Sequence, residues 1–153
     1  MGTIIRRMTI EFAHSQEVYH RDIKPENILF MDDGNKAILS DFGIAHFSKE
    51  YMIADSKTKS SDRLANFQYA APEQRIKGNT KLVDGRADIY SAGLILNEMF
   101  TGNLVAGNNY QKIGEIIPKY SYLDEIFERM YCQKPEERIF PATEISSLLD
   151  KHM

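Results

Sequence analysis

Hydrophobic and polar positions divide the chain into a mixed first part, a polar middle and a helical last half. Apolar residues recur at partly helical spacing over residues 7–18, which predicts a helix there. Two short apolar runs, residues 28–31 and 36–40, flank Asp32-Asp33-Gly34-Asn35 and predict a β-hairpin, because glycine, asparagine and aspartate tolerate the positive φ of tight turns. The polar residues 19–27 are expected to form the loop between this helix and the hairpin.

The last half of the chain predicts several helices. Apolar residues surround the axis of a helix over residues 86–100, so this helix should be central and buried, and Thr101-Gly102 supplies its end. Further helices are expected near residues 109–117, 121–131 and 141–150. Residues 44–70 have no sustained period and predict a long surface loop, and a loop of that length in a compact domain is usually functional or mobile.

Composition places the chain among ordinary globular domains. Its 153 residues suit one domain, and its 42% hydrophobic and 27% charged content excludes a disordered chain and a membrane protein. A net charge of -3 gives no electrostatic reason to expect a nucleic-acid or membrane partner. The single cysteine, Cys132, cannot form an internal disulfide, which fits a reducing compartment, and with no visible secretory signal this predicts a cytoplasmic protein.

The candidate chemistry lies in His20-Arg21-Asp22-Ile23-Lys24-Pro25-Glu26-Asn27 and, beyond the hairpin, in Asp41-Phe42-Gly43. Phosphoryl transfer needs a divalent cation, and Mg²⁺ accepts oxygen ligands while keeping several waters, so the carboxylate of Asp41 and the amide of Asn27 suffice. Asp22 is suited to orient a substrate hydroxyl and accept its proton, and Lys24 can touch the transferred group. The hairpin would bring both metal ligands to the same end of a rigid β unit.

This segment resembles the catalytic loop of eukaryotic-type serine/threonine protein kinases, H-R-D-x-x-x-x-N, followed by their D-F-G metal motif. Further matches follow in family order: Ala71-Pro72-Glu73, Asp88-Ile89-Tyr90-Ser91-Ala92-Gly93 and Pro135-Glu136-Glu137-Arg138. The resemblance implies a mainly α kinase C-terminal lobe, a helical bundle with a small β-hairpin that carries the catalytic and metal-binding loops. Its parts would be a first helix (1–18), the catalytic loop, hairpin and D-F-G (19–43), the activation segment (44–73) and a helical subdomain (84–153).

The resemblance also implies a role for each matching residue. The catalytic residues would be Asp22 and Lys24, and the Mg²⁺ ligands Asn27 and Asp41. ATP would contact Lys24, Asn27, Asp41 and Leu29, with the adenine against Leu29 between Ile28 and Phe30. The supporting residues would be His20, Arg21, Phe42, Gly43, Glu73, Asp88 and Arg138. Among these, His20 is expected to pack near Phe42 and not to transfer protons. Asp88 is expected to hold the catalytic-loop backbone, and Glu73 to pair with Arg138.

The serine- and threonine-rich residues 48–63 leave two interpretations open. They form either a solvated loop or an activation loop that is phosphorylated, with Thr58, Ser60 and Ser61 as candidate sites. Arg21 resembles the arginines on which loop phosphates dock, since a phosphate adds about -1.5 to -2 charges and three acceptor oxygens. The chain departs from the family at Ala65-Asn66, where Gly-Thr is usual. This difference bears on whether the enzyme prefers serine and threonine substrates.

A kinase also needs a glycine-rich loop, a strand lysine and a helix glutamate, and none of these precedes His20. The sequence therefore predicts a C-terminal lobe without its N-terminal lobe, with weak or no ATP binding and no useful turnover alone. The uncovered face would expose Ile28, Leu29, Phe42 and Ile44. We therefore expect an N-lobe or substitute partner, a homo-oligomer, a domain swap, or residues 42–70 folded over this face.

Three functions stay open at this point. The first is the catalytic fragment of a kinase that uses Mg²⁺ and ATP to phosphorylate a protein substrate. The second is a non-catalytic kinase-lobe module that binds or regulates a partner. The third is a small-molecule phosphotransferase, against which the A-P-E motif and the long segment before it argue, since they serve to bind a peptide.

Overall fold

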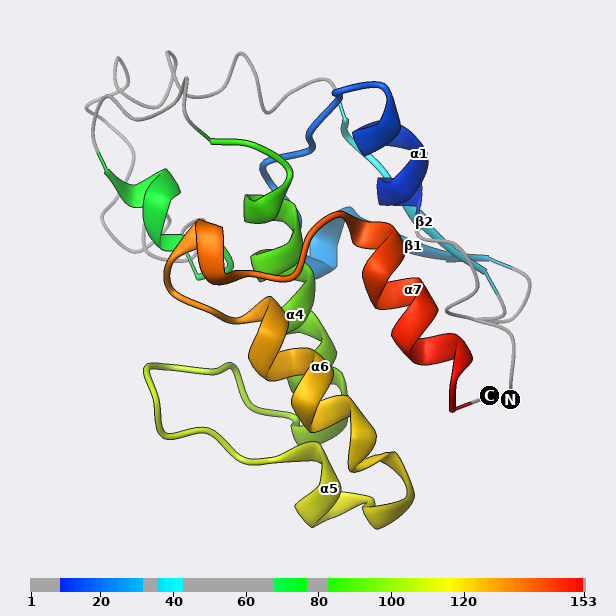
Figure 1. The fold of residues 1–153 in the computed structure, drawn as a ribbon, viewed down its shortest axis with the longest axis vertical. Coiled ribbons are helices and arrows are strands. Elements are labelled where there is room, and N and C mark those ends of the chain that lie inside the picture. The colour runs from blue at the N-terminus through cyan, green and yellow to red at the C-terminus, as the bar shows by residue number, and fades with distance from the viewer. Residues whose placement is uncertain (1–8, 32–35, 43–67, 77–82, 153) are drawn as a thin grey trace.

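The computed structural model describes residues 9–31, 36–42, 68–76 and 83–152, which form a bundle of helices beside a two-stranded sheet (Figure 1). The elements are, in chain order, α1 (Thr9–Ser15), η1 (Pro25–Asn27), β1 (Ile28–Met31), β2 (Lys36–Leu39), η2 (Pro72–Arg75), α4 (Arg86–Thr101), α5 (Ile113–Ile116), η4 (Pro118–Tyr120), α6 (Tyr122–Met130), η5 (Pro135–Glu137) and α7 (Ala142–Asp150). The structure is mainly α with one small hairpin, as the sequence predicts.

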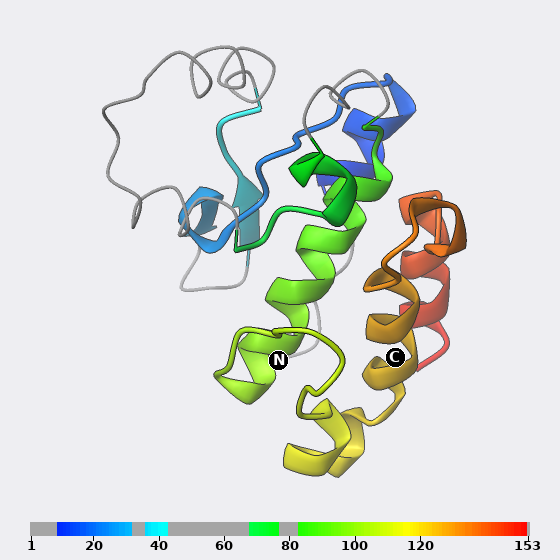
Figure 2. The ribbon, with the colours of Figure 1, turned by 90° about the vertical axis from the view of Figure 1, so that its left-hand side faces the viewer.

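Helix α4 lies at the centre of the bundle. Its residues from Ala87 to Ile95 are all buried, α6 runs beside it, and α5 contacts both helices (Figures 1 and 2). The helix ends at Gly102, whose φ of 71° is the left-handed conformation that glycine adopts without a Cβ penalty, and whose N–H donates to the Glu98 carbonyl at 2.8 Å. The predicted central helix and its stop are therefore confirmed.

Helix α5 is shorter than the predicted helix over residues 109–117. Lys112 is extended, with ψ of 143°, so the helix cannot begin before it. Its first turn is held from another element, because the Asp124 carboxylate of α6 accepts from the Ile113 N–H at 2.6 Å and from the Gly114 N–H at 3.0 Å. The other two predicted helices are present as α6 and α7, each within one residue of its expected ends.

The predicted hairpin is confirmed by antiparallel pairing of β1 with β2, with Ile28 opposite Leu39 and Met31 opposite Lys36. The side chains of Leu29, Phe30 and Met31 are 51%, 58% and 50% exposed, and because side chains alternate along a strand, Leu29 and Met31 share one face of β1 while Phe30 lies on the other. Helix α1, which lies within the predicted span of residues 7–18, packs on α7. Figure 2 shows the hairpin apart from α7, with α4 between them.

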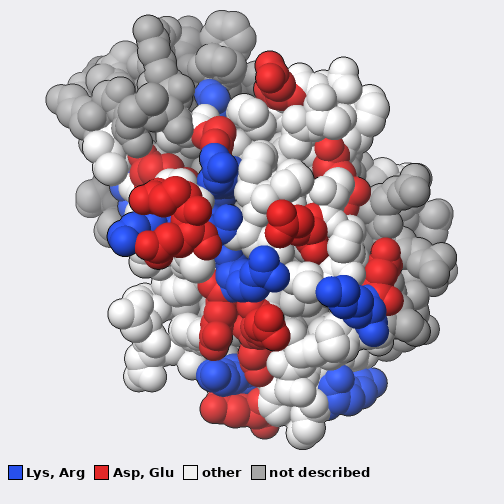
Figure 3. Space-filling view, viewed as in Figure 1, with Lys and Arg blue, Asp and Glu red and all other residues white. Residues whose placement is uncertain are grey.

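Two apolar clusters hold the bundle together. The larger one joins α1, α4, α6 and α7, and the smaller one is rich in aromatic rings from α4 and α6. In the smaller cluster, the ring of Tyr131 stacks on Tyr90 with 5.1 Å between centroids and on Phe127 with 5.2 Å. Acidic and basic side chains are interleaved on the face shown in Figure 3. Within the described ranges, each helix is too short or too polar to cross a bilayer.

Candidate active site

Asp88 of α4 anchors the loop formed by residues 19–27. The Asp88 side chain is buried, and its two oxygens accept from the backbone N–H of His20 at 2.8 Å and of Arg21 at 2.6 Å. Arg21 has a φ of 62°, a left-handed conformation that is uncommon outside glycine and needs such support from its surroundings. The expected contact between Asp88 and the loop backbone is therefore present.

The same loop places three polar side chains together. The Nζ of Lys24 lies 3.1 Å from Oδ2 of Asp22. The amide nitrogen of Asn27 donates to the Asp22 carbonyl at 2.8 Å and lies 3.5 Å from the Asp22 carboxylate. Asn27 is buried, whereas the Asp22 side chain is 44% exposed. The Asp22 carboxylate therefore contacts buried Asn27 within the fold and remains accessible to an incoming group.

Ser40 joins Asp41 to this group. The Ser40 N–H donates to the Asn27 carbonyl at 2.8 Å, and the Ser40 hydroxyl lies 3.1 Å from both that carbonyl and Oδ2 of Asp41. The hairpin therefore returns the chain to the loop, as its length predicts. Three residues that are separated in sequence, Asp22, Asn27 and Asp41, lie at one end of the hairpin.

His20 takes a structural position. Its ring is fully buried, its Nε2 lies 2.6 Å from the Ser40 carbonyl, and its ring packs edge-on against Phe42 with 4.8 Å between centroids. The expected packing against Phe42 is confirmed. The second ring nitrogen, Nδ1, lies 3.3 Å from the backbone nitrogen of Asp22, so both ring nitrogens are engaged within the fold. His20 therefore connects the loop to the segment that carries Asp41.

The expected pair of Glu73 and Arg138 is also present. Two guanidinium nitrogens of Arg138 meet the two carboxylate oxygens of Glu73 at 2.7 and 3.1 Å. Arg138 also donates to the Arg86 carbonyl at 2.8 Å and to the Cys132 carbonyl at 2.9 Å. This bidentate, charge-assisted contact attaches η2 to the helical bundle.

The donor set fits a magnesium ion. Because the amide nitrogen of Asn27 is engaged by Asp22, its amide oxygen is the atom available to a cation, and Ser40 connects the Asn27 backbone to the exposed carboxylate of Asp41. One amide oxygen and one carboxylate, completed by water and phosphate oxygens, suit Mg²⁺. Among the residues described, no group of three or more His, Cys, Asp or Glu side chains could hold a metal, so an all-protein metal cage is not seen there.

Two polar contacts near the loop are not predicted by the sequence. The Nε2 of His14 lies 2.9 Å from Asp88, so a histidine on the buried face of α1 supports the same carboxylate. The signal for it was a polar residue at helical spacing from the apolar Ile10. The hydroxyl of Tyr69 donates to Glu98 at 2.6 Å, and burial together with this carboxylate raises the Tyr69 pKa far above its ordinary value.

Several predicted positions add less to this geometry. Leu29 lies on the exposed surface of β1. The side chain of Arg21 donates to the Val83 carbonyl at 2.8 Å. The predicted residues Gly43, Ile44, Thr58, Ser60, Ser61 and Asn66 lie outside the described residues. Phosphorylation of that segment therefore stays a prediction.

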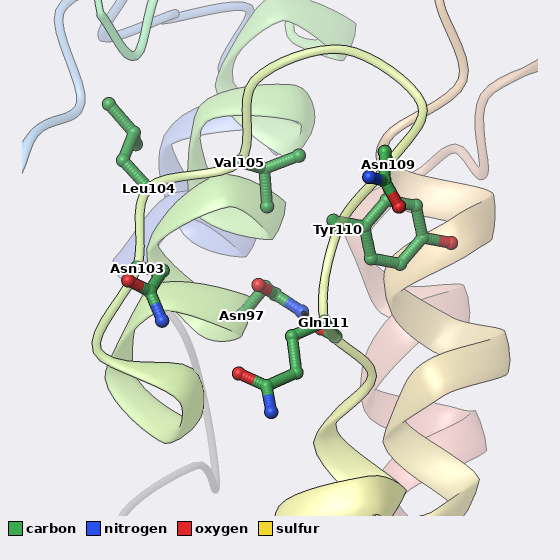
Figure 4. A pocket seen from close by; sticks show the side chains of 7 residues that line it. All are labelled: Asn97, Asn103, Leu104, Val105, Asn109, Tyr110 and Gln111. Carbon is green, nitrogen blue, oxygen red and sulfur yellow. Dashed lines mark hydrogen bonds between the residues drawn. The ribbon is translucent and has the colours of Figure 1, made fainter.

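A cavity of about 180 Å³ lies away from this loop, between α4 and the segment that leads to α5 (Figure 4). Its lining residues are Asn97, Asn103, Leu104, Val105, Asn109, Tyr110 and Gln111. Asn97 is buried, and its amide nitrogen donates to the Gln111 carbonyl at 3.0 Å, which ties the segment to α4. The cavity contains none of the predicted site residues.

Comparison with known proteins decides the family. The model of the protein kinase domain matches residues 3–151. The chain belongs to the protein kinase domain family. Among its relatives, serine/threonine-protein kinase PknL of Mycobacterium tuberculosis is 32% identical over 152 residues, covering 90% of this chain and 36% of the relative. A probable serine/threonine-protein kinase PknB of Bifidobacterium longum is 37% identical over 113 residues, covering 70% of this chain and 16% of the relative.

Solved structures support the kinase fold as well. The crystal structure of the Mycobacterium tuberculosis PknI kinase domain is 26% identical, with a TM-score of 0.60, and the match covers 94% of this chain and 50% of that one. The chain therefore spans about half of that kinase domain and 36% or less of the two curated relatives named above. The predicted kinase-like fold, helical with a small hairpin, is confirmed.

Proposed function

We propose that the chain carries the phosphoryl-transfer groups of a serine/threonine protein kinase, and that the complete enzyme transfers the γ-phosphoryl group of Mg·ATP to protein hydroxyls. The observation that carries this proposal is the convergence of Asp22, Asn27 and Asp41 in one hydrogen-bonded group. The names of the relatives, which are serine/threonine-protein kinases, support the same reaction class.

Each residue would have a distinct part in this reaction. The Asp22 carboxylate would accept the proton of the substrate hydroxyl as its oxygen bonds to the γ-phosphorus and the bond to ADP breaks. Lys24, which already lies 3.1 Å from Asp22, would neutralise charge on the transferred group. Asn27 and Asp41 would hold Mg²⁺, which when bound supplies charge neutralisation of the phosphates, and Leu29 would meet the adenine.

The test is Mg²⁺-dependent transfer of labelled phosphate from ATP to casein. We expect weak or no transfer by the 153-residue chain alone, and measurable transfer when the N-terminal lobe of a related kinase is fused ahead of residue 1. Asp22→Asn in that fusion should lose at least about 100-fold in rate, because general-base contributions are typically 10²–10⁴-fold. A fusion that binds ATP but transfers no phosphate would contradict the proposal.

The exposed surface of β1 favours a second candidate function, a non-catalytic module. Soluble monomers rarely leave large apolar surfaces uncovered, and on the surface of β1 the side chains of Leu29 and Met31 on one face and of Phe30 on the other are each exposed by half or more. We infer that an N-terminal kinase lobe or a second copy of the chain covers it. Sedimentation over a wide concentration range tests self-association, and Phe30→Ser should reduce it. A monomer at all concentrations would exclude the second copy.

A further inference from the structure

Gln74 joins two parts of the chain that are far apart in sequence. It lies in η2, directly after the Glu73 of the A-P-E motif, and its side chain is buried. Its Oε1 accepts from the Ala71 N–H at 2.9 Å, and its Nε2 donates to the Arg21 carbonyl at 2.7 Å. One amide group therefore caps the η2 turn and holds the backbone of the loop 19–27 at the same time.

The atom that Gln74 holds lies directly before the proposed base. The carbonyl of Arg21 belongs to the same rigid peptide plane as the N–H of Asp22, so a hydrogen bond to that carbonyl sets the orientation in which Asp22 leaves the backbone. Asp88 holds the preceding peptide plane through the Arg21 N–H at 2.6 Å. Both sides of the left-handed Arg21 residue are therefore fixed, one by Asp88 and the other by Gln74.

We propose that Gln74 is a positioning residue for Asp22, acting through the Arg21 carbonyl. Asp88 fixes the position of the loop on α4, and Gln74 connects it to the A-P-E segment, so that the placement of Asp22 depends on the placement of η2. This role rests on the proposed function for the part played by Asp22, whereas the hold of Gln74 on the loop backbone is independent of any activity.

Three variants of the 153-residue chain separate the two hydrogen bonds. Gln74→Glu keeps an acceptor for the Ala71 N–H but removes the donor to Arg21, and Gln74→Leu removes both. Gln111→Glu, at an exposed glutamine, is the control for the added negative charge. The readout is amide hydrogen exchange, measured by NMR at His20 and Arg21 in the loop and at Phe127 in α6.

Gln74→Glu should speed exchange at His20 and Arg21 about tenfold and leave Phe127 unchanged, because a buried carbonyl without its donor weakens the loop locally. Gln74→Leu should also speed exchange at His20 and Arg21, and the control Gln111→Glu should leave exchange unchanged in the loop and at Phe127. Equal exchange in Gln74→Glu and the wild type, or an equal increase at Phe127, would overturn the proposal, since the second result is a general loss of stability.

A kinetic comparison tests the link to Asp22. In the phosphate-transfer assay, Gln74→Glu should lower kcat about tenfold and leave the KM for ATP unchanged, because the metal ligands Asn27 and Asp41 do not depend on this bond. A raised KM with an unchanged kcat would contradict positioning of Asp22. If the fusion with the N-terminal lobe of a related kinase transfers no phosphate with glutamine at position 74, the proposed function fails, while the exchange comparison still decides whether Gln74 holds the loop.

Discussion

Replacing Asp88 with asparagine tests how the loop 19–27 is held in place. The Asp88 side chain is only 1% exposed, and its two oxygens accept from the His20 N–H, the Arg21 N–H and the ring of His14. Asparagine keeps one acceptor oxygen and replaces the other with an NH₂ group, which cannot accept a hydrogen bond. At least one buried N–H therefore loses its acceptor, and the remaining bonds lose the charge.

The expected cost follows from these two losses. A buried donor left without an acceptor costs about 1–3 kcal/mol, and a bond to a neutral acceptor is weaker than a bond to a carboxylate by about 1 kcal/mol. The Asp88→Asn variant should thus lose about 2–4 kcal/mol, a large part of the roughly 5–15 kcal/mol that stabilises a domain. With a urea slope of about 2 kcal/mol per molar, the unfolding midpoint falls by about 1–2 M.

Urea unfolding followed by circular dichroism measures this shift. Asp150→Asn makes the same chemical change at an exposed position of α7, and its midpoint should match that of the wild type. A midpoint for Asp88→Asn that coincides with this control would mean that the loop does not depend on the carboxylate.

Two further predictions concern stability. Arg138→Met should lower the free energy of unfolding by about 3–5 kcal/mol, because removing one member of a buried ion pair is strongly destabilising. Lys134→Met, which removes one member of an exposed pair, should leave the urea midpoint unchanged. Equal midpoints for the two variants would contradict the importance of the contact between Arg138 and Glu73. Burial raises the pKa of both Tyr90 and Tyr110 from 10.0 to about 12, so the stability that their neutral phenols contribute is complete below pH 10 and is lost as the pH rises toward 12. Ultraviolet absorbance measures the ionisation of the tyrosines, and the unfolding midpoint at each pH measures the stability. Ionisation of both rings near pH 10 with no loss of stability would contradict this prediction.

Much of the fold could be predicted because its signals are local. The hairpin depends on two apolar runs around a turn sequence, and α4 depends on apolar residues around its whole circumference. The positions of Asp22, Asn27 and Asp41 were inferred from motif and hairpin length together. The contact between Glu73 and Arg138, 65 residues apart, came only from the family resemblance.

The features that were missed depend on contacts between distant elements. The short α5 begins where it does because the Asp124 carboxylate of another helix accepts from its first N–H groups, and propensity cannot reveal such a partner. His14 reaches Asp88 across 74 residues and Gln74 reaches Arg21 across 53. A polar residue on a buried helical face is the local signal for His14, but only the fold identifies its partner.

We infer that Asn27 and Asp41 hold a divalent cation beside Asp22. Paramagnetic broadening of amide NMR signals by Mn²⁺ with ADP tests it in the 153-residue chain, because even weak binding broadens nearby signals. The signals of Ser40, Asp41 and residues 22–27 should broaden first, and this broadening should be lost in Asp41→Asn. Broadening centred elsewhere, or undiminished in Asp41→Asn, would contradict it.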